Sequence, residues 1–332
     1  QSQLEGYISR AEAGSKIVYF ASGVHYLDST WILAADGVKF TGAGMWYTKL
    51  QFTSSGMGSG GICGEKTGYC QNIEFCNMYI NSNLHSRFDQ QANYKCFRDL
   101  FAKGTSIHDV WEEHFECGFW IGRYDSNSIN KQSDLSIYNC RVRNNFADGI
   151  NFCQGTRDSN VHNCDIRNNG DDGLAMWNAT DFQQDDEYNN IFCYNTVEFI
   201  WRAGGIAVYG GDGHKVYNNY VRDMYLAAGI HVTDGFPGPK FQNTKKIEIA
   251  NNVVVRAGTY SDSWKEALAA IDVKGGVQNV EFNNNEVYDS QNNAIRTWDV
   301  SASTVSFNNT VVFGVGLDQH NDSYSCSAHS PT

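Results

Sequence analysis

The sequence predicts an all-β fold, a right-handed parallel β-helix whose coils are about 24 residues long. Two segments, IYNCRVRNNFADGI from Ile137 and VHNCDIRNNGDDGL from Val161, align without a gap at a separation of 24 residues. A repeat of fixed length that grows only by loop inserts is typical of a solenoid in which each repeat is one turn. The composition agrees, because 19 Phe, 18 Tyr and 8 Trp favour strands.

The predicted elements begin with a short helix within residues 1–16, where Leu4, Ile8 and Ala11 fall on one face. Such a helix would cap the open end of the solenoid, which otherwise exposes apolar side chains and unpaired strand edges. Rungs are expected from about residue 17 to 315, with inserts as loops and a tail over 316–332. We therefore expect one catalytic domain over residues 1–332.

One strand ladder is marked by a polar position that recurs at intervals of 24, 31, 24, 33, 33 and 24 residues. Its members are Cys140, Cys164, Asn195, Asn219, Asn252, Asn285 and Asn309, with Cys76 and Asp109 as looser matches upstream. Asn at equivalent turns of a solenoid forms hydrogen-bonded ladders, since it tolerates left-handed backbone geometry. The Cys140 and Cys164 pair is read equally well as stacked thiols or as a disulfide.

A second ladder follows the motif Gly/Ala-apolar-x-apolar. It starts at Gly149, Gly173, Gly205, Gly229, Ala270 and Ala294. Alternation places the apolar residues inward and the intervening residues outward. A sandwich of β-hairpins would instead require turn signals every 8–12 residues and no fixed register, so the β-helix is favoured.

Charge and cysteine content restrict the environment and the partners. The formal net charge of −12 repels nucleic acid and polyanionic glycans, which favours a neutral substrate. No apolar stretch reaches the ~20 residues of a membrane span. Ten cysteines, including Cys63 and Cys70 around a glycine-rich loop, suggest disulfides and an oxidising compartment. We expect a secreted monomer that binds a polysaccharide and neither nucleic acid nor a membrane.

Three aspartates carry the candidate chemistry. Asp148 and Asp172 precede the second-ladder glycines of successive coils, so they should stack about 5 Å apart. Asp171 lies at the same corner but projects differently. Packing does not explain stacked acids, because like charges on neighbouring strands repel. A carboxyl group kept protonated by acidic neighbours, with others that activate water, predicts glycosidic hydrolysis. A calcium site or a solvated acidic turn is the alternative.

The outward positions of the second ladder should form the substrate-binding strip. They are Asn151, Trp177, Tyr209, His231, Asp272, Arg296 and Trp298. Inserts over 180–187, 234–240 and 260–266 would wall this groove. No cofactor is required. Trp111-Glu-Glu-His lacks the second histidine of a zincin, so we expect no catalytic metal, although a structural calcium is compatible with the acidic loops.

The segments NFADGIN from Asn145, NNGDDGLAMW from Asn168, GIAVYGG from Gly205 and AGIHV from Ala228 resemble glycoside hydrolase family 87. That resemblance covers roughly Ile107–Trp298 and implies an endo-acting, inverting hydrolase of α-1,3-glucosidic bonds in a neutral α-glucan. It also implies a three-aspartate centre at Asp148, Asp171 and Asp172. By further similarity to the dextranase and polygalacturonase β-helices, Asp171 would be the acid and the other two the bases. Exchanged roles for Asp171 and Asp172 remain open.

Three alternatives accompany this interpretation. A polysaccharide lyase or epimerase on the same fold would use Lys274 or Arg296 on the groove strip as a base. A hydrolase of another α-glucan, such as dextran, nigeran or pullulan, would share the three aspartates. A non-catalytic, glycan-binding β-helix would bind sugar without cleaving it.

Overall fold

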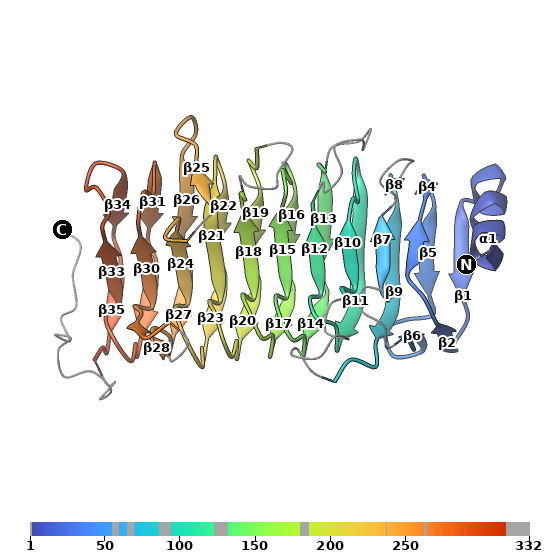
Figure 1. Cartoon of the computed structure of the whole chain (residues 1–332), viewed down its shortest axis with the longest axis horizontal. Helices are drawn as coiled ribbons and strands as arrows, with labels where there is room; N and C mark the ends of the chain where they lie inside the picture. Colours follow the sequence, from blue (N-terminus) through green and yellow to red (C-terminus); the bar gives the residue numbers. More distant parts are fainter. Residues whose placement is uncertain are drawn as a thin grey trace.

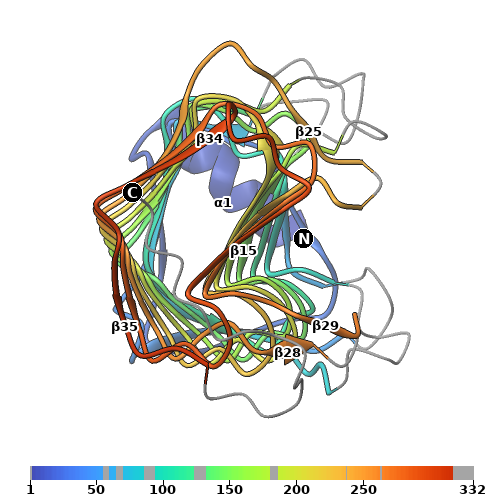
Figure 2. The same cartoon turned by 90° about the vertical axis from the view of Figure 1, so that its left-hand side faces the viewer.

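The computed structural model describes residues 2–54, 60–64, 70–85, 94–122, 132–179, 186–236, 238–261 and 264–316. Its strands pair in parallel from coil to coil, and the coils lie side by side from the N-terminal helix to the C-terminal strands (Figure 1). The predicted right-handed parallel β-helix with a capping helix is confirmed. Viewed along the axis, successive coils superimpose around one interior (Figure 2).

One sheet, here called the cleft face, contains the second ladder of the sequence. Its strands are β3 (Trp31–Leu33), β7 (Ile62–Gly64), β10 (Phe97–Asp99), β12 (Phe119–Ile121), β15 (Ile150–Cys153), β18 (Leu174–Trp177), β21 (Ile206–Gly211), β24 (Ile230–Thr233), β30 (Ile271–Lys274) and β33 (Ile295–Trp298), with β25 (Lys240–Phe241) beside β21.

The other long sheet bends into two faces, because β9 (Glu74–Asn81) and β11 (Thr105–Glu113) run through the bend. The second face holds β1 (Ile17–Phe20), β5 (Lys39–Gly42), β13 (Leu135–Tyr138), β16 (Asn160–His162), β19 (Ile191–Cys193), β22 (Lys215–Tyr217), β26 (Ile247–Ala250), β31 (Val280–Asn283) and β34 (Val305–Asn308).

The third face follows each bend. It holds β2 (Gly23–Leu27), β6 (Thr48–Phe52), β14 (Arg141–Arg143), β17 (Asp165–Arg167), β20 (Thr196–Glu198), β23 (Tyr220–Arg222), β27 (Val253–Val255), β32 (Glu286–Tyr288) and β35 (Val311–Phe313). Two short pairs complete the fold: β4 (Ala35–Asp36) with β8 (Cys70–Gln71), and the antiparallel hairpin of β28 (Tyr260–Ser261) and β29 (Glu266–Ala267).

The interior is a stack of apolar side chains in register. The predicted second ladder is confirmed, since Ile150, Leu174, Ile206, Ile230, Ile271 and Ile295 pair in sequence. Ring stacks extend the same order, with Phe97 and Phe119 centroids 4.8 Å apart. Side chains alternate along each short strand, so one side faces the interior and the other faces outward. The two-residue period of apolar residues therefore identifies the inward positions.

The bend between the second and third faces contains two consecutive asparagines with different roles: the first adopts the left-handed backbone, and the side chain of the second forms hydrogen bonds. Asn251 takes a left-handed backbone (φ 55°), which Asn tolerates better than most residues. Asn252, next along the chain, is buried, and its side chain donates to Val216 O at 2.9 Å and to Asn285 Oδ1 at 3.0 Å. The same bonds join Asn195, Asn219, Asn252 and Asn285 into a ladder.

The ladder differs from the prediction at both ends. Phe282 pairs with Phe307, a separation of 25 residues, so the mate of Asn285 is Thr310 and not Asn309. Upstream, Val110 pairs with Met78, and these apolar residues take the inward position that was assigned to Asp109 and Cys76. In these early coils the interior side of the bend is filled by hydrophobic packing, so no asparagine marks the register.

Replacing Asn252 by Ala should lower the free energy of unfolding by about 2–4 kcal/mol, because it orphans buried backbone and side-chain groups. Asn219 donates to Asn252 Oδ1 through both its backbone and its side-chain N–H. Urea denaturation measures the loss. Asn308→Ala, at an exposed position, should change stability by less than about 0.5 kcal/mol. Equal losses in the two variants would contradict the role of the ladder.

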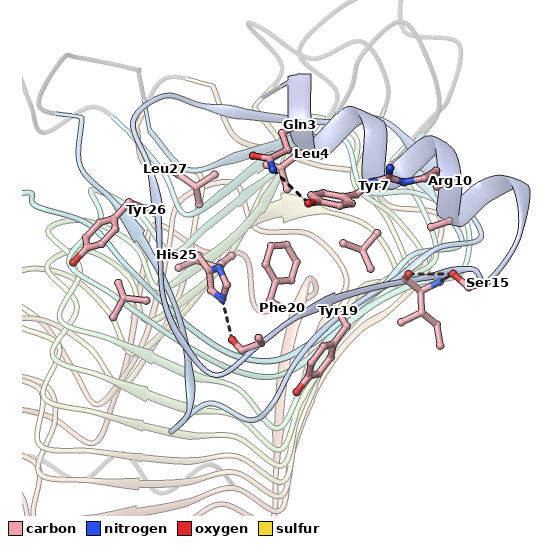
Figure 3. A pocket seen from close by; sticks show the side chains of 16 residues that line it. Gln3, Leu4, Tyr7, Arg10, Ser15, Tyr19, Phe20, His25, Tyr26 and Leu27 are labelled. Atoms are coloured by element: carbon pink, nitrogen blue, oxygen red, sulfur yellow. Dashed lines mark hydrogen bonds between the residues drawn. The ribbon is translucent and has the colours of Figure 1, made fainter.

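Helix α1 (Ser2–Ala13) caps the N-terminal end, as predicted. Ile8 and Ala11 are buried, and Leu4 packs against the same core. The helix covers only part of the first coil. A hollow of about 780 Å³ remains between it and β1–β2, where Tyr7, Phe20 and Leu27 line the wall (Figure 3).

The cysteines behave as small buried apolar residues. Cys140 and Cys164 are free buried thiols, which decides for stacking over a disulfide at this pair. Cys63 and Cys70, which could close the glycine-rich loop, are not bridged to each other, and the Cys63 thiol lies 3.0 Å from Asp99 Oδ2. No helix among the described residues is long and apolar enough to cross a membrane. The predicted tail beyond Gly316 and most of the 180–187 insert lie outside the described residues.

Candidate active site

The three aspartates lie at the corner that leads into the cleft face. Asp148 precedes β15 and Asp172 precedes β18, and the Gly149 N–H donates to Asp172 O at 2.9 Å, so the two acids occupy the same place on adjacent coils. Asp171 occupies the preceding position, with its N–H donating to Ala147 O. One carboxylate oxygen from each residue lies within 4.8 Å of the others. The predicted convergence is therefore present.

The environments of the three carboxylates differ sharply. Asp148 and Asp172 are only 6 % and 4 % exposed, whereas the Asp171 side chain is 22 % exposed and forms an ion pair with Arg202. Asp172 Oδ1 accepts the Gly204 N–H at 2.8 Å, and Tyr209 hydrogen-bonds to the same carboxyl group. Burial nevertheless dominates and raises the pKa of Asp172 to about 7.

This raised pKa has a consequence for stability. An unfolded aspartate has a pKa of about 3.8. Between about pH 4 and pH 7 the folded protein keeps a proton that the unfolded chain has lost, so the free energy of unfolding falls as the pH rises. We expect thermal melts to show this decline, and Asp172→Asn to flatten it. An unchanged pH dependence in that variant would contradict the burial of a protonated Asp172.

A cleft of about 420 Å³ opens beside this corner. Its floor comes from strands β21 and β24, and its walls come from the loop after β24 and the β28–β29 hairpin, both predicted as groove inserts. The lining residues are Asp171, Asp172, Ala203, Tyr209, His231, Thr233, Gly235, Phe236, Trp264, Glu266, Leu268 and Lys274. Three aromatic rings and three carboxyl groups thus line one space that is large enough for sugar units.

Two of the predicted binding residues line the cleft. Tyr209 is buried next to Asp172, with its ring 5.8 Å from His231. Both ring nitrogens of His231 lack a hydrogen-bond partner among the described residues, and burial lowers the pKa of this histidine. Nε2 lies 3.8 Å from Asp272 Oδ1, beyond hydrogen-bond distance. A neutral imidazole whose nitrogens make no hydrogen bond, facing a cleft, is suited to bind a hydroxyl group.

Asn151, Trp177 and Trp298 lie on the predicted strip but do not line this cleft. Trp177 packs on Tyr209 and meets the ring of Trp120 edge-on at 5.8 Å. Trp298 is half exposed at the end of β33. Any sugar contact they make is therefore outside the pocket of the aspartates, and their binding role stays a prediction.

Asp272 and Arg296 face outward from the coil but are covered by the β28–β29 hairpin. The alternation of inward and outward residues in the sequence does not reveal this cover. Arg296 donates to both oxygens of Asp272, through Nε at 2.6 Å and Nη2 at 2.9 Å. Asp272 also accepts the Ala269 N–H at 2.9 Å. The hydrogen bonds of this pair reach hairpin strand β29 through the Ala267 carbonyl, and its sugar contacts stay a prediction.

Sequence reasoning missed several residues of the site. Arg202 lies in the turn between β20 and β21 and Glu266 in the hairpin insert, and at neither position does a repeated residue type signal a role in the site. Trp120, the ring partner of Trp177 outside the cleft, had a signal, since Gly118-Phe-Trp-Ile is one further copy of the second-ladder motif. The aspartate corner offers three oxygen ligands within 4.8 Å, so the calcium alternative stays a prediction.

Comparisons with known proteins converge on one family. A family model described as "Alpha-1,3-glucanase catalytic domain D2" matches residues 6–324. The catalytic domain of Agl-KA is 34 % identical, with a TM-score of 0.85 over 94 % of this chain and 62 % of that one. No curated protein sequence matches significantly.

Two more distant structures show the fold alone. The catalytic domain of a GH87 α-1,3-glucanase in complex with nigerose is 20 % identical (TM-score 0.72; 97 % of this chain, 66 % of that one). The A-module of the mannuronan C-5 epimerase AlgE4 from Azotobacter vinelandii is 14 % identical (TM-score 0.60; 98 % and 95 %). The present chain thus spans about two thirds of the length of the glucanase domains.

Proposed function

Because this chain belongs to the family of α-1,3-glucanase catalytic domains, we propose that it hydrolyses internal α-1,3-glucosidic bonds of a neutral α-glucan. The observation that carries the proposal is the corner where Asp148, Asp171 and Asp172 meet beside an aromatic-walled cleft. Carboxyl groups in unequal environments supply the acid and base of glycoside hydrolysis.

We propose an inverting mechanism in which Asp148 and Asp172 position the attacking water. Both are almost fully buried, so a water molecule reaches them more easily than the anomeric carbon of a sugar does. The carboxylate spacing within 4.8 Å is shorter than the ~6.5–9.5 Å usual for inversion. A nucleophilic carboxylate must touch the anomeric carbon directly. The burial of Asp148 and Asp172 hinders that contact, so it favours inversion.

Asp171 is our candidate for the acid. It is the most exposed of the three and lines the cleft, where a glycosidic oxygen would lie. Burial raises the pKa of Asp172 to about 7, which keeps one proton at this corner near neutral pH. In this proposal Asp172 passes its proton to Asp171, which donates it to the leaving oxygen, and the Asp172 carboxylate then accepts a proton from the attacking water. Arg202 fixes the orientation of the Asp171 side chain.

A substrate panel tests the proposal. The chain is incubated with α-1,3-glucan, nigeran, dextran, pullulan and polygalacturonate, and reducing ends and ultraviolet absorbance are followed. We expect reducing ends from α-1,3-glucan, and from the α-1,3 bonds of nigeran, without unsaturated products. Reducing ends from dextran or pullulan alone would shift the assignment to another α-glucan. Unchanged glycan throughout would favour a binding protein.

Trp264 in the hairpin wall should act on binding rather than on chemistry. Its ring is 42 % exposed and lies 6.4 Å from the ring of His231, open to a sugar face. Trp264→Ala should raise KM by about 10-fold with little change in kcat, because it removes uniform binding. Trp46→Ala, which removes another exposed indole away from the cleft, is the matched control. A loss confined to kcat would refute a stacking role.

The lyase or epimerase alternative receives little support from the groove cations. Lys274 donates to both oxygens of Glu266, and Arg296 is buried against Asp272. Neither is placed as an unpaired base beside the aspartates. Secretion, a monomeric state and independence from cofactors stay predictions, which fractionation, light scattering and assays in chelator test separately.

A further inference from the structure

A second cluster of chemistry-bearing side chains lies on the second face, in a different sheet from the cleft. Glu74 and Cys76 are two apart on β9, so both point outward, and Cys76 pairs in register with His108 on β11. One atom of each side chain lies within 4.8 Å of the others. We propose that Glu74, Cys76 and His108 form a binding site for a divalent cation of the zinc class.

The spacing fits a tetrahedral ion closely. With metal–ligand bonds of ~2.0–2.3 Å, oxygen and nitrogen ligands lie about 3.4 Å apart, and oxygen and sulfur about 3.6 Å. Here Glu74 Oε1 is 3.2 Å from His108 Nε2 and 3.7 Å from Cys76 Sγ. The three donors therefore need little movement to share one ion, and water can supply the fourth ligand.

The surroundings of His108 match those of a metal ligand. Its Nδ1 lies 2.7 Å from Asp109 Oδ2, a contact that holds the proton on Nδ1 and leaves the Nε2 lone pair for the site. The imidazole also stacks on Tyr138, with centroids 4.6 Å apart and planes 7° from parallel. Ring orientation and tautomer are thus fixed before an ion arrives.

The donor set selects the class of ion. A thiolate, an imidazole and a carboxylate favour zinc-like ions over calcium or magnesium, which prefer oxygen ligands. Cys76 is fully buried, but Glu74 is 39 % exposed and provides an entry path. Bound between β9 and β11, the ion would cross-link adjacent coils.

The ammonium group of Lys39 would compete with the metal ion for the Glu74 carboxylate. This group lies 2.6 Å from Glu74 Oε1, the oxygen assigned to the metal, from the neighbouring strand β5. The Lys39 side chain is 36 % exposed and can turn to solvent. Lys39→Met should therefore tighten metal binding, by about 10-fold, a result that a purely structural cluster does not predict.

Metal titration of the untagged, chelator-treated protein tests the site. Zn²⁺ is added in a calorimeter and Co²⁺ in a spectrophotometer, where a thiolate ligand produces a charge-transfer band. We expect one ion per chain and that band. Cys76→Ser should abolish the band and weaken Zn²⁺ binding by about 100-fold, and Asp109→Asn should weaken it by about 10–100-fold with the band retained.

The controls separate this site from the rest of the molecule. Cys164→Ser alters another buried thiol and should leave both titrations unchanged. The ligand group at the aspartate corner consists of carboxylates, and a band from Cys117, which lies next to Asp148 on the preceding coil, would survive in Cys76→Ser. The proposal is overturned if no band appears, if the band survives in Cys76→Ser, or if Cys164→Ser removes it equally. None of these outcomes depends on glucanase activity.

Discussion

Asp171→Asn is expected to lower kcat on α-1,3-glucan by about 10²–10⁴-fold, with KM changed far less. General acid catalysis contributes on this scale, and an amide cannot donate the proton that the leaving oxygen needs. Initial rates of reducing-end release measure the effect. The folded state should persist, since this side chain lies at the surface of the cleft and not in the interior.

The matched variant Asp148→Asn separates the acid from the bases. Loss of the acid should be largely repaired by a substrate whose leaving group needs no proton, such as an aryl glycoside. Loss of a base should not be repaired in this way, but added azide can replace the activated water. If Asp172→Asn, and not Asp171→Asn, responds to the aryl leaving group, the two acids exchange their proposed roles.

Asp272→Ala should produce the largest loss of stability, about 3–5 kcal/mol, because it leaves a buried guanidinium without its bidentate partner. Asp272 is fully buried, and without it Arg296 keeps Glu266, the Ala267 carbonyl and the face of Trp298 among the described residues. Chemical denaturation gives the free energy of unfolding.

An exposed ion pair is the control for that variant. Lys246→Ala breaks a contact of 2.7 Å with Glu281 at the surface and should cost less than about 1 kcal/mol. Joint replacement of Asp272 and Arg296 by Leu and Met should recover much of the stability, since no buried charge is left alone. A small effect of Asp272→Ala would mean that water already reaches the pair.

The parts of the fold that repeat were predictable from the sequence. Each inward Ile or Leu of the second ladder recurs because every coil must fill the same interior, and this register alone stacked Asp148 on Asp172. Prediction failed at Asn309 because the last interval is 25 residues and not 24, so neither Asn308 nor Asn309 takes the inward position. The true mate, Thr310, contains no amide to mark the register.

Residues in the inserts could not be predicted, for a physical reason. The alternation of side chains along a strand predicts an exposed residue only where no other segment covers that face. The β28–β29 hairpin covers Asp272 and Arg296. Arg202 meets Asp171 from the turn between β20 and β21 on the next coil, where the repeat sets the path of the chain but not which side chain it carries. The aspartates were therefore predictable, but the groups that set their protonation and orientation were not.

Proton NMR of the first products from α-1,3-glucan tests the central claim most directly. If the buried Asp148 and Asp172 deliver water to the anomeric carbon, the β-anomer of the new reducing end appears first, and mutarotation then produces the α-anomer. An α-anomer at the earliest time points, or an unsaturated product in place of a reducing end, would contradict the account.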